Sequence, residues 1–81
     1  MITQYPLGTE KSIRLMEAEN KLIFVVDEKA NKTEIKQDLE ERFKANVKSV
    51  NTHNMGGRKK AIVTFGEDTL AIDIATKLGL L

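Results

Sequence analysis

The chain has 81 residues, with 13 lysines and arginines against 12 acidic residues, no cysteine and a formal net charge of +1. This length predicts a single domain over residues 1–81 with a small core, because chains of this size bury only ~60% of the surface that their unfolded form exposes. The absence of cysteine excludes disulfides, thiolate nucleophiles and cysteine-based metal sites. No stretch approaches the ~20 apolar residues of a membrane span, so we expect a soluble, cytoplasmic protein without membrane insertion.

The first third of the chain predicts a helix followed by a buried strand. Thr9 is a suitable N-cap for a helix over residues 10–19, because its hydroxyl can accept a hydrogen bond from a free N–H of the first turn. The β-branched and aromatic run Leu22–Val26 is too short for a core helix and predicts a strand with little solvent exposure. A short edge strand over Ile2–Tyr5 stays open, since four residues before a proline carry little signal.

The middle of the chain predicts an amphipathic helix. Asn31 and Glu34 have the spacing of a capping box, in which each side chain bonds a backbone N–H near the other, so we expect the helix to begin there. Ile35, Leu39 and Phe43 then recur every four residues and give the helix one apolar stripe that faces inward.

The last part of the chain predicts a β-hairpin and a third helix. Apolar and polar residues alternate over Val47–His53 and Lys60–Phe65, on either side of a turn at Asn54–Gly57. A helix over residues 69–78 has an apolar face and ends at Gly79. The resulting order, (β)αβαββα, predicts an α+β fold with split βαβ, ferredoxin-like character. Its mostly antiparallel sheet of three or four strands would place the final strand between two parallel ones.

The positive charge is concentrated in one segment. Residues 44–60 hold no acid and carry five bases, which are Lys44, Lys48, Arg58, Lys59 and Lys60. The net charge of +1 is therefore the sum of +5 in this segment and −4 elsewhere. We expect these charges to gather along one edge of the sheet, where four or five phosphate contacts predict a log–log salt slope of ~−3 to −4. The alternative is a solvated hairpin tip whose lysines discourage strand addition.

Polar side chains near the hairpin favour contact with the backbone and shape of folded RNA over base stacking. Phe24, Phe43 and Phe65 fall at expected core positions, which leaves Tyr5 as the free aromatic residue. The run Asn51–Asn54 offers hydrogen bonds to phosphates, riboses or base edges, although such residues also suit a strand end and a turn.

No catalytic or metal-binding arrangement stands out in the sequence. The single histidine, His53, has no cysteine to activate and no serine in a triad-like motif. Adjacent acids such as Glu40 and Glu41 point in different directions on a helix, and no EF-hand spacing occurs. Gly56 and Gly57 match no phosphate-loop motif and are better explained by a turn. We therefore expect no catalytic residue, no metal and no cofactor.

Five segments carry a resemblance to a known family, and they are Pro6–Lys11, Asn20–Val26, Ala30–Lys36, Val47–Thr52 and Arg58–Val63. In this order and spacing they resemble family twenty-three of the large-subunit ribosomal proteins, which lies beside the polypeptide exit tunnel. The likeness covers nearly the whole chain. It implies a non-enzymatic structural protein of the cytoplasmic ribosome that binds large-subunit ribosomal RNA, and the family fold agrees with the αβαββα order.

The resemblance also implies functional residues and partners. RNA contact is expected of Thr9, Lys11, Lys32, Asn51, Thr52, Arg58, Lys59 and Lys60. Two further RNA-binding candidates, added from charge and position alone, are Arg14 and His53. Glu10 is expected to lie on a docking surface for factors that meet the nascent chain. Expected partners are the neighbouring large-subunit proteins at the tunnel exit, the signal recognition particle and the protein translocon.

The chain departs from the bacterial pattern of this family. Only a short loop separates its last two strands, so the long hairpin extension that reaches into the tunnel is missing and the chain resembles the short archaeal type. Lys44 stands where bacterial members can carry an acid, which argues against the chaperone docking known for bacteria.

Two other functions are open on the same fold. A small acylphosphatase-like hydrolase would use Arg58 to hold phosphate and Asn51 to orient water. However, the loop after the first main strand, Asp27–Lys29, puts two acids where such enzymes carry glycine and arginine. A ligand-binding or protein-interaction module would make the +5 segment incidental.

Overall fold

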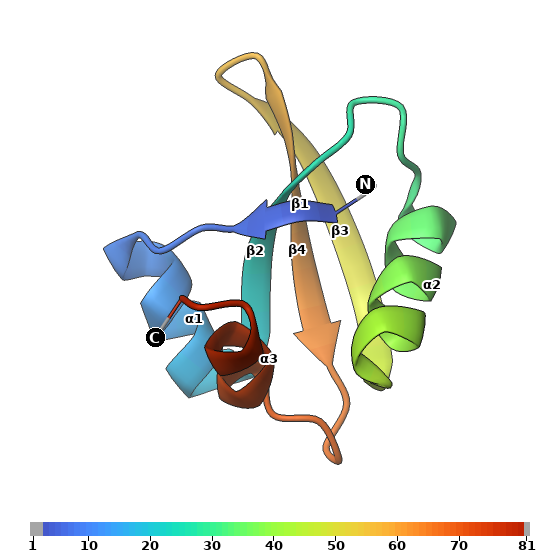
Figure 1. Cartoon of the computed structure of the whole chain (residues 1–81). Coiled ribbons are helices and arrows are strands. Elements are labelled where there is room, and N and C mark those ends of the chain that lie inside the picture. Colours follow the sequence, from blue (N-terminus) through green and yellow to red (C-terminus); the bar gives the residue numbers. More distant parts are fainter. Residues whose placement is uncertain (1–2, 81) are drawn as a thin grey trace.

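The computed structural model describes residues 3–80, which form four strands and three helices in the predicted order (Figure 1). The elements are β1 (Thr3–Pro6), α1 (Glu10–Glu19), β2 (Lys21–Val26), α2 (Lys32–Phe43), β3 (Val47–Met55), β4 (Arg58–Phe65) and α3 (Ala71–Lys77). The strands form one sheet with the order β1-β2-β4-β3, in which neighbouring strands are antiparallel. β4 therefore lies between the parallel strands β2 and β3, and the predicted α+β, split βαβ arrangement is confirmed.

Both predicted helix starts form the expected caps. Thr9 Oγ1 accepts a hydrogen bond from Ser12 N at 3.2 Å, and α1 covers the predicted residues. At the start of α2, Glu34 N donates to Asn31 Oδ1 at 2.8 Å, while Asn31 N donates to Glu34 Oε1 at 3.2 Å. These bonds satisfy N–H groups that the first turn of a helix leaves without an intrahelical partner, so both predictions are confirmed.

The hairpin is longer than predicted. Its strands extend to Met55 and Arg58, so the turn consists of Gly56 and Gly57 and not of the expected Asn54–Gly57. The two glycines have φ angles of 61° and 76°. Glycine adopts such angles at little cost, and a two-residue turn with positive φ at both positions matches the twist of the flanking strands.

The two ends of the chain also differ from prediction. The edge strand that was left open forms as β1 and extends to Pro6, whereas Ile2 lies outside the described residues. Proline fits there because β1 is an edge strand, where one ladder hydrogen bond can be missing. Helix α3 covers residues 71–77 instead of 69–78. Within residues 3–80, no helix has the length and apolar character needed to cross a membrane.

Asn20 explains the late start of α3. This residue ends α1 in the left-handed conformation, with a φ of 57°. Its Nδ2 lies 3.3, 3.3 and 2.8 Å from the carbonyl oxygens of Phe65, Gly66 and Thr69. Its Oδ1 accepts a hydrogen bond from Ala71 N at 2.7 Å. One side chain thus holds residues 66–69 in a turn and caps the helix that follows.

The core lies between one face of the sheet and all three helices (Figure 1). Alternate residues of the two central strands point into it, namely Leu22, Phe24, Val26, Ala61, Val63 and Phe65. The helices contribute residues such as Met16, Ile35 and Ile74 to the same cluster. Since side chains alternate along a strand, Ile23 and Ile62 lie on the opposite face, which we call the open face.

Candidate nucleic-acid interface

Two neighbouring rows of side chains cross the open face of the sheet. In the first row, Lys60 of β4 lies directly opposite His53 of β3. In the second row, Ile62 lies opposite Asn51 of β3 on one side and Ile23 of β2 on the other. Residues directly opposite in an antiparallel pair have Cβ atoms roughly 5 Å apart, so these side chains are neighbours. Three of the predicted RNA-binding residues therefore lie together on this face.

A hollow of about 130 Å³ opens on the same face, next to the start of α1. Its lining combines three aliphatic side chains, Leu7, Ile23 and Ile62, with four polar or cationic ones, Thr9, Lys11, His53 and Lys60. All four of the latter were predicted to contact RNA. None of the described residues that line the hollow is acidic. Cations that are far apart in the sequence are thus brought together around a small apolar surface.

The backbone around Ser12 holds the start of α1 against the sheet. Leu7 N donates to Ile23 O of β2 at 2.8 Å, which continues the β1–β2 pairing beyond the strand. The buried Ser12 hydroxyl lies 2.7 Å from Leu7 O and 2.8 Å from Thr9 O, so its single hydrogen can be shared between these two carbonyl oxygens at the bend into α1. These bonds fix the position from which Lys11 reaches the hollow.

Other predicted RNA-binding residues lie outside the hollow. Thr52 lies opposite the buried Ala61, so it belongs to the helix-covered face. Lys59 belongs to the same face, and its Nζ donates to the backbone oxygen of Ala30 at 2.5 Å. Lys32 is the first residue of α2 and is exposed in the helix layer. The resemblance assigned these three residues to RNA contact, and that assignment stays a prediction.

Two predicted arginines have partners of their own. Arg58 donates a hydrogen bond to the Tyr5 hydroxyl at 2.6 Å. Tyr5 is 42% exposed, but the expectation that it would be a free aromatic residue was wrong. Arg14 lies one helical turn beyond Lys11 and pairs with Glu10 at 2.9 Å, with both side chains largely exposed. Such exposed pairs are worth only ~0–1 kcal/mol, so either residue can exchange its partner for another.

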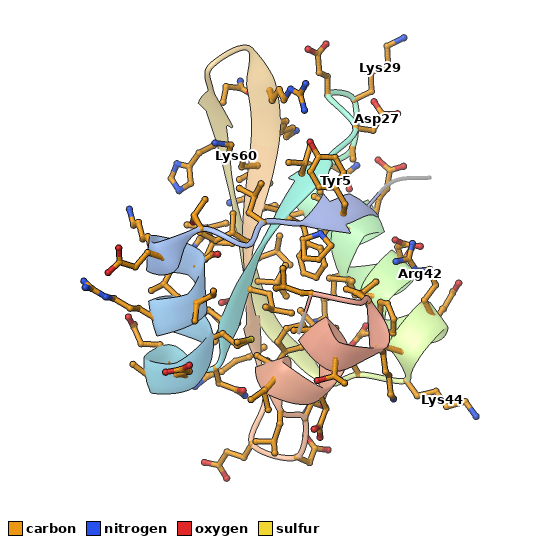
Figure 2. The ribbon with its side chains drawn as sticks, turned by 60° about the vertical axis from the view of Figure 1, so that its left-hand side comes forward. Tyr5, Asp27, Lys29, Arg42, Lys44 and Lys60 are labelled. Carbon is orange, nitrogen blue, oxygen red and sulfur yellow. The ribbon has the colours of Figure 1, made fainter. Side chains whose placement is uncertain are left out.

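The five bases of residues 44–60 do not gather in one place. Lys44 ends α2, and Figure 2 shows it at the opposite corner of the molecule from Lys60, which lies on the hairpin above the start of α1. Lys59 and Lys60 point to opposite faces because they are adjacent in a strand. The expectation of one basic edge was therefore wrong. Of the five bases only Lys60 lines the hollow, and Lys11 of α1 is the other lysine there.

A second surface groove has the opposite charge. It has a volume of about 640 Å³ and lies where the end of α1 meets the residues before and within α3. Its lining includes the acids Glu17, Glu19 and Glu67 together with Leu70 and Ile72, which are 54% and 44% exposed. Sequence reasoning missed this groove, as it missed the aliphatic lining of the hollow, because both depend on which distant segments meet.

Two further kinds of site bear on the alternative functions, a metal site and a phosphate site for a hydrolase. Among residues 3–80, no group of three or more histidine, aspartate or glutamate side chains could hold a metal ion. The hydrolase alternative needs a phosphate site at the loop Asp27–Lys29. That loop lines a hollow with Arg58, where Asp27 and Glu28 offset much of the positive charge of Lys29, Arg58 and Lys59, so this hollow is a poorer phosphate site than the one on the open face.

Comparison with known proteins agrees with the resemblance seen in the sequence. Residues 1–72 match the model of the family described as ribosomal protein L23. A large ribosomal subunit protein uL23 from Methanococcoides burtonii is 51% identical over 78 residues, covering 95% of this chain and 94% of the relative. The protein of the same name from Haloarcula marismortui is 40% identical over 80 residues, covering 98% of this chain and 94% of the relative.

Proposed function

The chain belongs to the ribosomal protein L23 family, and from this premise we propose that it binds large-subunit ribosomal RNA through the open face of its sheet. Membership makes the chain a structural constituent of the large ribosomal subunit and not an enzyme, so the predicted family and the non-enzymatic role are confirmed. The hydrolase alternative is thereby set aside. The proposal concerns which surface of the protein contacts the RNA.

The observation that carries the proposal is the group of basic side chains around the hollow. Lys11, His53 and Lys60 meet there, with no acid in the described lining. Arg14 and Arg58 extend this positive surface along α1 and the hairpin. RNA presents closely spaced phosphates, and cations that replace condensed counterions gain affinity from the release of those ions. Asn51, exposed beside Ile62, adds a hydrogen-bonding group for riboses or base edges.

We also propose that the protein lies next to the polypeptide exit tunnel, beside neighbouring large-subunit proteins, and presents Glu10 to nascent-chain factors. The signal recognition particle and the protein translocon are the factors that the family resemblance suggests. The exposed Glu10 carboxylate supports this proposal, because its pairing with Arg14 is mostly in solvent and costs little to break. Because only Gly56 and Gly57 connect β3 to β4, the hairpin has no long extension, and we assign it no role in lining the tunnel.

A salt titration with a transcribed fragment of large-subunit RNA tests the RNA contact. If Lys11, Arg14, Arg58 and Lys60 meet phosphates, the log–log slope of affinity against salt should be ~−3 to −4. Lys60→Gln should make that slope shallower by ~0.7–0.9 and weaken binding roughly 5- to 10-fold at ~0.1 M salt.

Lys77→Gln is the matched control, because Lys77 is exposed on α3. This variant should bind RNA like the wild type. Binding that does not depend on salt, or equal losses in the two variants, would contradict the proposed surface.

A further inference from the structure

We propose that the hollow on the open face receives a single unpaired nucleobase, so that the protein recognises one extruded nucleotide as well as the phosphate backbone. This inference rests on the proposed RNA-binding function and specifies what the RNA must present at that site. The hollow is the place where aliphatic side chains and cations meet, and the argument follows from its lining, its size and its surroundings.

The lining is apolar where a solvated sheet face would be polar. A sheet covered by helices on one face normally alternates apolar and polar residues along its strands. Instead, Ile23 and Ile62 form an aliphatic pair across β2 and β4 on the open face, and Leu7 lies next to Ile23. Ile23 is already buried in the free protein, at 8% exposed, whereas Leu7 and Ile62 are only partly buried. Their burial against a flat ring would remove apolar surface from water.

The size of the hollow suits one ring system. Its volume of about 130 Å³ is several times the ~30 Å³ that a water molecule occupies in the liquid. It is also well below the ~300–1,000 Å³ of pockets that enclose drug-sized ligands or cofactors. A single heteroaromatic base is a flat group of intermediate size, and an unpaired base presents both faces and its hydrogen-bonding edge.

Basic side chains lie on both sides of the aliphatic pair. Lys11 comes from α1, beyond β1, whereas His53 belongs to β3 at the other edge of the sheet. An extruded nucleotide is flanked by two phosphates, and this arrangement offers a hydrogen-bond donor to each of them, the Lys11 ammonium on one side and an imidazole N–H of His53 on the other. The Thr9 hydroxyl accepts a hydrogen bond from Ser12 N and still carries a hydrogen that it can donate to a base edge.

An abasic scan of the RNA fragment combined with Ile62→Thr tests this inference. Threonine keeps the β-branched shape that suits a strand but puts a hydroxyl in the aliphatic lining. Wild-type affinity should fall roughly 10-fold when one particular unpaired base is removed, a loss of the size expected when the apolar surface buried between one ring and the aliphatic side chains is exposed again. Ile62→Thr should show a similar loss on intact RNA, an unchanged salt slope and no further loss at the abasic position.

The matched control is Ile72→Thr, which makes the same chemical change at an exposed residue of α3 and should leave RNA affinity unchanged. If Ile62→Thr unfolds the protein, Ile62→Val, which trims one methyl group, keeps the test available through a smaller loss at the same position. The inference is overturned if no unpaired position couples to Ile62 while Lys60→Gln still weakens binding, and the proposed function then survives.

Loss of salt-sensitive binding by the wild type would instead defeat the proposed function itself. If Ile62→Thr binds the RNA normally but fails to enter large subunits, the hollow holds a side chain of a neighbouring protein and the inference is wrong.

Discussion

The hollow on the open face and the groove between α1 and α3 have the same construction and opposite charge. Each combines aliphatic side chains, several of them exposed or half-buried, with a set of basic or acidic ones. Lys11, His53 and Lys60 surround the first, whereas Glu17, Glu19 and Glu67 surround the second. The net charge of +1 for the whole chain hides this difference between the two surfaces. One suits phosphates and the other suits a basic partner or solvent.

Helix α1 connects the two regions and shows how the fold separates charge. Its first turn carries Lys11 to the hollow, and its last turn carries Glu17 and Glu19 to the groove. The helix dipole adds positive potential at the N-terminus and negative potential at the C-terminus, so it strengthens both surfaces. Acids at a helix C-terminus are unfavourable for the helix itself, and no base occupies the last turn of α1. The charge separation therefore comes at some cost in helix stability.

Substitution of Asn20 should have the largest effect on the protein and should affect the groove more than the hollow. Asn20→Ala removes all the side-chain hydrogen bonds to the turn before α3 and puts a non-glycine, non-asparagine residue at a φ of 57°. We expect a loss of ~3 kcal/mol in the free energy of unfolding, which lowers the melting temperature by roughly 10–20 °C.

Asn20→Gly separates the two causes, because glycine accepts the positive φ but makes none of the side-chain bonds. It should be about 1 kcal/mol less destabilising than Asn20→Ala. RNA affinity measured well below the melting temperature should stay near the wild-type value in both variants. A large loss of RNA affinity in a folded Asn20 variant would contradict the independence of the two regions.

Removal of two cations from the hollow should have the next largest effect. Lys11→Gln combined with Lys60→Gln removes one charge from α1 and one from β4, and should weaken RNA binding roughly 50-fold at ~0.1 M salt. The matched double variant, Glu17→Gln with Glu67→Gln, neutralises two acids in the groove. It should leave RNA binding unchanged or slightly stronger. Equal losses in both double variants would show that the RNA does not distinguish the two surfaces.

Local signals predicted the elements and their order, because each depends on neighbouring residues. The capping box of Asn31 and Glu34, the short apolar run Leu22–Val26 and the alternation before Phe65 are of this kind. The pairing of strands followed from the general rules for split βαβ units. The longer hairpin followed from Gly56 and Gly57, which suffice for a two-residue turn once both adopt positive φ.

The candidate site depends on the register of the paired strands and on which face of the sheet each side chain points to. The sequence alone does not specify either. A continuous apolar run does not show which of its residues face the helices, so Ile23 could not be assigned to the open face. Counting charge along residues 44–60 grouped Lys59 with Lys60, although neighbouring strand residues point apart. Lys11 reaches the same hollow because β1 pairs with β2 and places the start of α1 beside the sheet, and no local sequence signal specifies that pairing.

Adjacent lysines of β4 offer the smallest and most selective test of the comparison. Lys59 donates to Ala30 O, just before the cap of α2, and lies on the helix-covered face. Lys59→Met keeps the aliphatic stem and removes this charged hydrogen bond, so we expect a loss of ~1–2 kcal/mol in stability. Lys60→Met, the matched control at the neighbouring position, should change stability little and weaken RNA binding roughly 5- to 10-fold at ~0.1 M salt.

Thermal unfolding and RNA titration of the two variants together decide the roles of these lysines. A lower melting temperature with nearly normal RNA affinity in Lys59→Met, and the reverse in Lys60→Met, would separate a lysine that stabilises the fold from one that meets phosphate. If Lys59→Met instead weakened RNA binding as strongly as Lys60→Met at an unchanged melting temperature, the RNA would have to reach around the hairpin. The positive surface would then include both faces of β4.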